Sequence, residues 1–252
     1  MVRAYLTRTA APNAMACPYV LDIPRGVRPD RTMKLHYTDG SPYARKVRIV
    51  LLEKGLPFEP ANRGSVPMTA PWPGPTRAVP VLEDKGQTIW ESDVIVDYIL
   101  KTYPGAPAAT DTPPLAPWLV RPDREWEDRT TLATLSTCAA SMINLRFLWV
   151  DGLTAENSDY LTQQRARVEQ CLDWLETRVT DEGFAPGWLS VMDLAFICPM
   201  DFALTRGVMN WRGRKKLDAL FDRYRTRPSL IATQLNPSPP ISPRYELERR
   251  PA

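Results

Sequence analysis

Residues 78–95 read Ala-Val-Pro-Val-Leu-Glu-Asp-Lys-Gly-Gln-Thr-Ile-Trp-Glu-Ser-Asp-Val-Ile. Two strand-like runs, Val79–Glu83 and Gln87–Trp90, flank the turn signal Asp84-Lys85-Gly86. Such a turn joins antiparallel strands, because its residues accept the positive φ that a tight hairpin requires. Glu91-Ser92-Asp93 then opens a helix, since small polar and acidic residues favour helix starts. We therefore expect a β-hairpin followed directly by a helix.

The sequence upstream of this hairpin predicts a strand, a helix and a second strand. Lys34–Thr38 is a short alternating run. Ser41 followed by Pro42 is a helix start, with a hydroxyl at the cap and a proline at the first helical position. Gly55 closes that helix, and an extended segment begins near Pro57. The order β-α-β-β-β-α, with a parallel crossover first and the hairpin last, indicates an α/β domain.

Downstream of this domain the pattern becomes helical. Of the 26 prolines, 18 lie in residues 1–122, two in 123–227 and six in the last 25 residues. Within the proline-poor block, apolar residues recur every three or four positions in two long stretches, and a segment from about Ser190 is apolar almost all round. We therefore expect a disordered leader at 1–32, an α/β domain at 33–104, a linker at 105–122, an all-helical domain at 123–235 and a proline-rich tail at 236–252.

Composition and charge argue against several classes of function. The chain is 44% hydrophobic and 24% charged, as globular proteins are, and its net charge of +3 supplies no basic face for nucleic acid. No segment approaches the roughly 20 uncharged apolar residues of a membrane span. The one histidine, His36, lies in a predicted strand, which argues against a Ser/His/Asp or Cys/His hydrolase. Four cysteines without paired spacing predict reduced core residues rather than disulfides or metal ligands: Cys17, Cys138, Cys171 and Cys198.

Six short motifs, taken in chain order, resemble the cytosolic glutathione S-transferases (GSTs). They are Ser41–Arg48, Glu53–Glu59, Val79–Leu82, Trp90–Ile95, Ser190–Asp193 and Arg227–Ser229. The resemblance spans residues 33–235 and implies an N-terminal thioredoxin-like domain that binds glutathione, followed by a C-terminal helical bundle domain. It also implies a glutathione-dependent transferase, which stabilises the glutathione thiolate for attack on a small hydrophobic electrophile.

The same resemblance implies a set of glutathione-binding residues. Pro80 resembles the cis-proline of thioredoxin-like proteins, which turns the backbone of Val79 toward the cysteinyl backbone of glutathione. Glu91 and Ser92 lie at a helix start, where exposed N–H groups favour an anion, so they suit the γ-glutamyl end. A plain capping role for Ser92 is the alternative. The glycine carboxylate needs a cation, and the sequence leaves three candidates: Arg45, Arg63 and Arg77.

Ser41 is the first candidate for stabilising the thiolate. A free thiol has a pKa of about 8.5, so glutathione is mostly protonated at neutral pH, and a hydroxyl at a helix N-terminus can stabilise its thiolate. Thiol-transferase-type members have Cys-Pro-Tyr at this place, so Ser41 favours conjugation over disulfide reduction. Tyr37, on the preceding strand, is the second candidate. A plain helix-capping role for Ser41 is the alternative.

Two further regions bear on the electrophile and on the fold. The electrophile is expected in the cleft between the domains, beside Met142, Leu145 and Trp149 and beside the C-terminal tail, although a Met/Trp stripe also suits a core. The prolines between Phe58 and Val79 predict that the second helix usual in the family is short or missing.

Related functions remain as alternatives. The Ser-Pro-Tyr start also resembles bacterial β-aryl etherases, in which glutathione displaces an aryloxide. Residues 47–55 and 90–92 resemble stringent-starvation regulators, which keep the fold, do not conjugate and bind the transcription machinery. The combination of Ser41, Pro80, Glu91 and Ser92 favours the enzyme. The family further implies glutathione as co-substrate, no bound metal, a cytoplasmic homodimer and a role in detoxification.

Overall fold

The structure is a computed structural model that describes residues 33–65, 70–105, 109 and 111–235. The expected leader at 1–32 and the expected tail at 236–252 lie outside the described residues. The elements, in chain order, are β1 (Lys34–Tyr37), α1 (Pro42–Glu53), β2 (Glu59–Asn62), η2 (Arg63–Ser65), β3 (Val81–Asp84), β4 (Gln87–Trp90), α2 (Ser92–Thr102), η3 (Pro122–Arg124), α3 (Glu125–Val150), α4 (Asp159–Arg178), α5 (Val191–Thr205), α6 (Lys215–Tyr224) and α7 (Pro228–Ala232).

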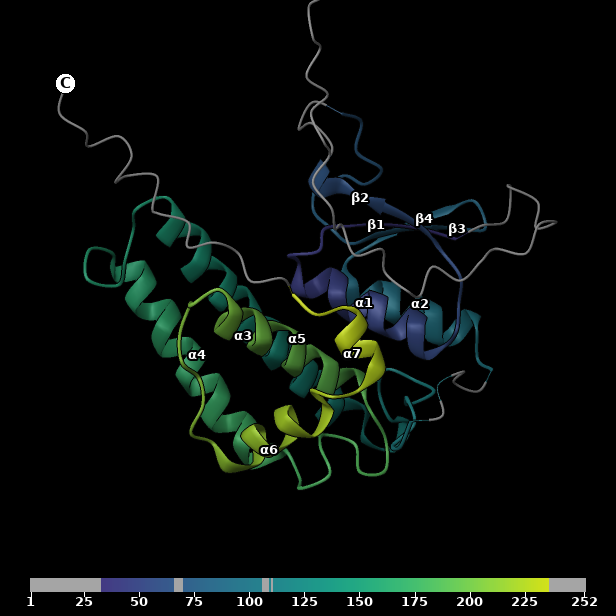
Figure 1. Cartoon of the computed structure of the whole chain (residues 1–252). Coiled ribbons are helices and arrows are strands. Elements are labelled where there is room, and N and C mark those ends of the chain that lie inside the picture. The colour runs from purple at the N-terminus through teal and green to yellow at the C-terminus, as the bar shows by residue number, and fades with distance from the viewer. Residues whose placement is uncertain (1–32, 66–69, 106–108, 110, 236–252) are drawn as a thin grey trace, which may run out of the picture.

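The N-terminal elements form one four-stranded mixed sheet with the strand order β2-β1-β3-β4. β1 pairs with β2 in parallel and with β3 in antiparallel fashion, and β3 pairs with β4 as the predicted hairpin. α1 and α2 lie on the side of the sheet that faces the helical region (Figure 1). This arrangement confirms the expected thioredoxin-like domain, and the helices that follow it confirm the expected helical C-terminal region.

Local sequence signals account for the ends of these elements. Lys85 and Gly86 have φ values of 49° and 77°, the left-handed pair that a two-residue hairpin turn requires. Ser41 caps α1, because its Oγ accepts a hydrogen bond of 3.2 Å from the backbone N–H of Ala44. The capping alternative for Ser92 is wrong: Glu91 occupies the cap position of α2 with φ 66°, and Ser92 is the first helical residue.

The segment between β2 and β3 contains little regular structure. Among its described residues, only the 3₁₀ turn η2 follows β2, and residues 66–69 are not described. The expectation that the second helix of the family is short or missing is therefore confirmed for the described part. The prolines explain it, because each removes a backbone donor that a helix needs.

The helical region is built around α5. α3 packs along α4 and against α5, and nearly all residues of α5 are buried. Ser190 and Asp193 form the predicted capping box at its start. Pro199 lies inside α5, which the structure records as one helix from Val191 to Thr205.

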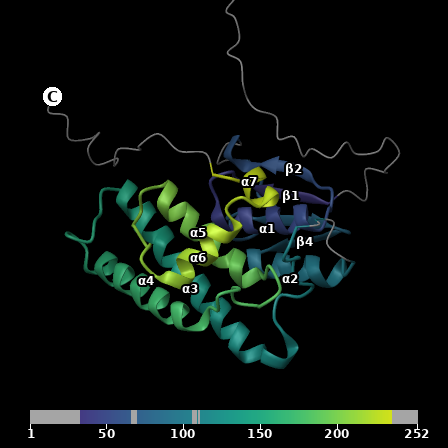
Figure 2. The same cartoon turned by 60° about the horizontal axis from the view of Figure 1, so that its bottom comes forward.

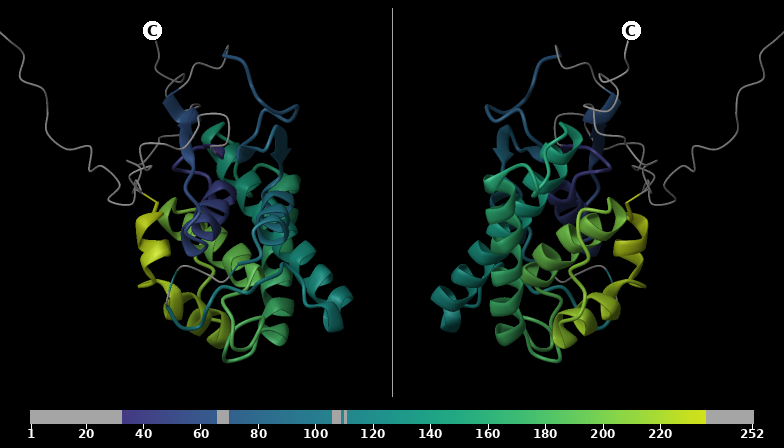
Figure 3. Two further views of the ribbon diagram at one scale, coloured as in Figure 1. Left: turned by 90° about the vertical axis from the view of Figure 1, so that its right-hand side faces the viewer. Right: turned by 90° about the vertical axis from the view of Figure 1, so that its left-hand side faces the viewer.

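The two regions meet along α1, which packs against α5 and α7. Figure 2 shows α7 beside α1, and both side views in Figure 3 place the yellow α7 against the purple α1. The first helix of the thioredoxin-like domain is therefore enclosed between its own sheet and the helical region. Its N-terminus, with Ser41, lies at the border between the two.

Candidate functional site

A cavity of about 330 Å³ lies where the thioredoxin-like domain meets α3. It brings together the residues before β3, the start of α2, the first turn of α1 and one residue of α3. Its lining residues are Tyr43, Thr76, Ala78, Val79, Pro80, Glu91, Ser92, Asp93 and Ser136. Four residues predicted to bind glutathione, from two separate sequence motifs, therefore share one cavity: Val79, Pro80, Glu91 and Ser92.

The cavity wall combines an extended strand entry with a helix start. The peptide bond between Val79 and Pro80 is cis, as the resemblance to thioredoxin-like proteins implied. The helix α2, which also borders the cavity, begins at Ser92. Its first backbone N–H groups therefore lack partners within the helix and can receive an anion. The wall thus offers main-chain hydrogen bonding on one side and a helix N-terminus on the other.

Asp93 links the cavity to both neighbouring helices. Its carboxylate forms an ion pair with Lys46 of α1 and accepts a hydrogen bond of 3.2 Å from the hydroxyl of Ser136 on α3. Tyr43 lies in the same place, and burial, followed by the charges of Asp93 and Glu91, raises the pKa of its phenol to about 12. The Tyr43 hydroxyl is therefore protonated at neutral pH and can donate a hydrogen bond.

The two predicted thiolate-stabilising residues do not line this cavity. Ser41 is half-buried at the start of α1, two residues before Tyr43. Tyr37 is half-buried at the end of β1, and the guanidinium carbon of Arg48 lies 4.7 Å from the centre of its ring. Of the three, only Tyr43 faces the predicted glutathione-binding residues directly.

The three arginine candidates occupy different surroundings. Arg45 is buried, and its guanidinium contacts Asp201, the carbonyl oxygen of Leu230 at 3.2 Å and Thr233 at 3.4 Å. This placement corrects the expectation that Arg45 holds the glycine carboxylate, because the side chain points away from the cavity into the helical region.

Arg63 and Arg77 both lie in the connection between β2 and β3. Arg63 donates a hydrogen bond of 2.8 Å to the carbonyl of Pro71 and stacks on Trp72, at 4.4 Å from the ring centre. Arg77 is exposed and lies between Thr76 and Ala78, both of which line the cavity. Of the three cations, Arg77 is therefore the one whose chain neighbours border the candidate site.

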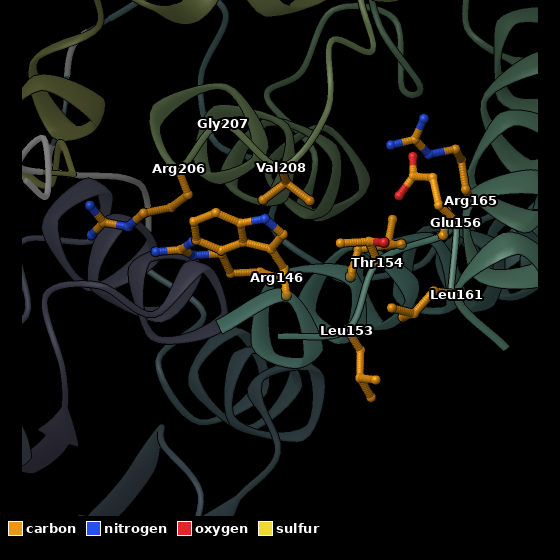
Figure 4. A pocket seen from close by; sticks show the side chains of 12 residues that line it. Arg146, Leu153, Thr154, Glu156, Leu161, Arg165, Arg206, Gly207 and Val208 are labelled. Atoms are coloured by element: carbon orange, nitrogen blue, oxygen red, sulfur yellow. The ribbon is translucent and has the colours of Figure 1, made fainter. Parts of the chain in front are cut away.

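A second cavity, of about 280 Å³, lies at the other end of α3 (Figure 4). Its lining residues are Leu145, Arg146, Trp149, Leu153, Thr154, Ala155, Glu156, Leu161, Arg165, Arg206, Gly207 and Val208. Of the residues predicted beside the electrophile, Leu145 and Trp149 line this cavity. Met142 is fully buried in the core and does not.

The remaining sequence candidates are structural. Cys138, Cys171 and Cys198 are free thiols, two of them buried, and Cys17 lies outside the described residues. His36 is buried and pairs with Glu83 on the neighbouring strand. In the described part of the chain, no group of three His, Cys, Asp or Glu side chains could hold a metal ion. Nor does any helix described here combine the length and the apolar character needed to cross a membrane.

Sequence reasoning missed Tyr43, Asp93 and Ser136. The first two stand inside quoted motifs, two residues after Ser41 and one after Ser92, so their positions carried a usable signal. Ser136 had none, because it reaches the cavity only through the packing of α3 against the start of α2.

Comparison with known proteins agrees with this geometry. Residues 35–107 match the family model described as "Glutathione S-transferase, N-terminal domain". An uncharacterized GST-like protein of Escherichia coli, YibF, is 28% identical over 181 residues, which are 70% of this chain and 84% of that protein. A glutathione S-transferase of Pseudomonas putida is 41% identical over 75 residues, which are 29% of this chain and 34% of that protein.

Solved structures extend the similarity to the helical region. A glutathione S-transferase from Methylobacterium radiotolerans, in complex with glutathione sulfonate, has a TM-score of 0.67 and 25% identity, and the match covers 82% of this chain and 97% of that one. A second, from Methylobacillus flagellatus, has a TM-score of 0.65 at 22% identity and covers 81% of this chain and all of that one, which shows a shared fold. Residues 35–107 are therefore a glutathione S-transferase N-terminal domain, and the motif order and the fold make the chain as a whole similar to the glutathione S-transferases.

Proposed function

We propose that this protein is a glutathione-dependent transferase that activates the glutathione thiol for attack on a small hydrophobic electrophile. One observation carries the proposal: Val79, Pro80, Glu91 and Ser92 line a single cavity of about 330 Å³ beside the N-terminus of α1. The Methylobacterium radiotolerans relative, whose structure holds glutathione sulfonate, supports glutathione as the co-substrate.

Each end of glutathione has a partner in this arrangement. The backbone of Val79 pairs with the cysteinyl backbone, as an added strand would. The γ-glutamyl carboxylate meets the backbone N–H groups at the start of α2, and its ammonium group meets the carboxylate of Glu91. Arg77, whose neighbours border the cavity, holds the glycine carboxylate.

The thiolate is stabilised at the start of α1. The Ser41 hydroxyl accepts its hydrogen bond from Ala44 through a lone pair, so its own O–H remains to donate to sulfur. The N-terminus of α1 adds a positive partial charge. Tyr43, which keeps its proton at neutral pH, is a second donor for the same sulfur, and Tyr37 is a third.

Titration of the thiolate by its ultraviolet absorbance, in the complex with glutathione, separates these donors. We expect the wild-type complex to show a thiol pKa below the free value of about 8.5 and Ser41→Ala to return it to that value. Tyr43→Phe and Tyr37→Phe serve as comparisons, because each removes one hydroxyl and keeps the ring. A lowered thiol pKa that persists in Ser41→Ala but is lost in Tyr43→Phe transfers the role to Tyr43.

Retention on immobilised glutathione tests the proposal as a whole. Absence of binding at millimolar glutathione would overturn it in favour of the regulator-like alternative, in which the fold persists without conjugation. Release of a phenol from an aryl ether probe, measured against conjugation of an aryl halide, distinguishes an etherase from an ordinary conjugating enzyme.

We further propose that the protein is a cytoplasmic homodimer that acts in detoxification. Exposed apolar residues support self-association: Trp90 and Val94, which flank the cavity residues 91–93, are 38% and 54% exposed, and Trp126 at the start of α3 is 77% exposed. Burial of such residues against a second copy is favourable. Sedimentation equilibrium would then give twice the chain mass of 28.5 kDa, and Trp126→Glu would shift the protein toward the single chain.

A further inference from the structure

The second cavity is lined at one end by cations. It lies between the C-terminal end of α3, the connection from α3 to α4, and the turn that follows α5. Figure 4 shows the guanidinium groups of Arg146 and Arg206 at the same end, with Glu156 and Arg165 at the other. The wall therefore separates into two charged ends with apolar residues between them.

Arg146 is the unusual residue of this wall. It is only 8% exposed, no described residue forms an ion pair or hydrogen bond with its guanidinium, and the guanidinium nitrogens open onto the cavity rather than being sealed from solvent. The guanidinium carbon lies 4.9 Å from the centre of the Trp149 ring. A cation that faces a cavity and lacks a protein counter-charge gains from an anion bound there, because a cation–π contact supplies only part of that stabilisation. The site therefore suits an anion.

The neighbour of Arg146 strengthens this conclusion. Burial, followed by the positive charge of Arg206, lowers the pKa of the Arg146 guanidinium. An anion placed beside Arg146 offsets this repulsion, and a carboxylate matches the planar donors of a guanidinium in two-point fashion. The acid of this cavity, Glu156, lies at the opposite end, where a hydrogen bond from Thr154 and the charge of Arg165 lower its pKa.

The cationic end is adjacent to the turn that presents Ser41. A Cβ atom built on Gly40, the residue before Ser41, would lie 3.4 Å from the Nη2 atom of Arg206. On α3, Ser136 faces the first cavity and Leu145 the second, nine residues or about 14 Å apart at 1.5 Å per residue. Ser41 thus lies next to a residue that approaches the cationic end of the second cavity, and two residues before Tyr43, which lines the first.

We propose that the second cavity binds the electrophile and that this electrophile carries a carboxylate on an aromatic body. The carboxylate lies between Arg146 and Arg206, and the ring packs on the apolar wall formed by Leu145 and Trp149. That the reactive carbon of this electrophile meets the glutathione thiolate rests on the proposed function. The thiolate sulfur forms a bond to an aryl carbon that carries chloride, the carbon–chlorine bond breaks, and chloride leaves with the electron pair.

Binding without glutathione tests the site independently of the chemistry. The probe is 4-methyl-3-nitrobenzoate, which has no leaving group, titrated into the protein by isothermal calorimetry. Its methyl ester is the neutral match. We expect wild type to bind the carboxylate more tightly than the ester. Arg146→Met should lower the affinity for the carboxylate at least tenfold and leave the affinity for the ester unchanged. Arg129→Gln, an exposed arginine on the same helix that pairs with Glu125, is the control and should leave both affinities unchanged.

Should Arg146→Met fail to fold, Arg206→Gln is a second variant, because the side chain of Arg206 is less buried. It should also lower the affinity for the carboxylate and leave that for the ester unchanged. Equal affinity of wild type for carboxylate and ester, or an unchanged carboxylate affinity in both arginine variants, overturns the proposal. Conjugation of glutathione to 4-chloro-3-nitrobenzoate then tests whether the reactive carbon meets the thiolate. We expect the ratio of kcat/KM for this acid to kcat/KM for its methyl ester to fall at least tenfold in Arg146→Met. Selective carboxylate binding without any glutathione turnover refutes the proposed function and leaves the anion site standing.

Discussion

The guanidinium of Arg227 holds the carboxylate of Glu53 through hydrogen bonds of 2.6 and 2.8 Å, although 174 residues separate the two in the chain. Both side chains are buried, with exposures of 4% and 0%. The hydroxyl of Ser229 donates to the same carboxylate. Two of the six sequence motifs are thus one structural unit, which fastens the C-terminal end of α1 to the start of α7.

Glu53→Gln should therefore be strongly destabilising. The amide keeps the volume of the side chain but leaves Arg227 buried without a counter-charge, which costs about 3 kcal/mol of unfolding free energy in pairs of this kind. Urea denaturation followed by circular dichroism measures the loss. Glu125→Gln breaks the exposed pair with Arg129 and should cost under about 0.5 kcal/mol, so equal losses in the two variants would contradict the prediction.

Glu91→Gln should lower the affinity for glutathione about tenfold without changing the stability of the fold. One charge-assisted hydrogen bond to the γ-glutamyl ammonium group contributes roughly that much binding free energy. Glu91 is exposed in the cavity wall, so the fold does not depend on its charge. Calorimetric titration with glutathione measures the change. Asp97→Asn removes a carboxylate from the same helix, where it pairs with Lys101 on the surface, and should leave the affinity as it is. Equal effects of the two substitutions would remove Glu91 from the site.

Cys171 should be the first of the described cysteines to react with iodoacetamide. A hydrogen bond from the Cys138 thiol lowers the pKa of Cys171 to about 7, and its side chain is half-buried. The same hydrogen bond, with burial, raises the pKa of Cys138, and burial raises that of Cys198 to about 11. Because the thiolate is the nucleophile, mass spectrometry after brief labelling at pH 7.5 should find Cys171 modified and the other two intact. Faster labelling of Cys138 would reverse the assignment of donor and acceptor.

Asp193 should make the stability of the protein depend on pH. Burial raises the pKa of this carboxyl to about 6, above the unfolded value of about 3.9, so the folded state binds the proton more tightly. The contribution is fully present below about pH 4 and is lost as the pH rises through 6, by roughly 3 kcal/mol at most. Urea denaturation between pH 4 and 7 should show wild type losing stability relative to Asp193→Asn. A difference between the two proteins that is constant over this range would refute the prediction.

Local signals made much of the fold predictable. The Ser41-Pro42 helix start, the turn at Lys85 and Gly86 and the capping box at Ser190 all depend on residues within four positions of one another. A short stretch of sequence contains every residue that such a feature needs. The local conformation that it favours therefore does not depend on the tertiary context. The first cavity was predictable for a related reason, because two such stretches supply most of its wall.

The errors concern side chains whose partners are distant in the chain. Arg45 lies on the first turns of α1, near the expected ligand, but α5 and α7 pack on the face of the helix that carries it. Ser136 is one polar residue in a long amphipathic helix and acquires its place only when α3 meets Asp93. No pattern within the thioredoxin-like domain shows which of its charges will face a second domain.

The burial of Arg45 and Glu53 limits how this protein can be recombined with its relatives. Both lie on α1, and their charged groups are neutralised by Asp201 and Arg227 of the helical region. A chimaera that joins this N-terminal domain to the helical region of another transferase would enclose two opposite charges against foreign surfaces. Exchange of the domains therefore requires exchange of these four residues together, and the border between the domains is a poor crossover point.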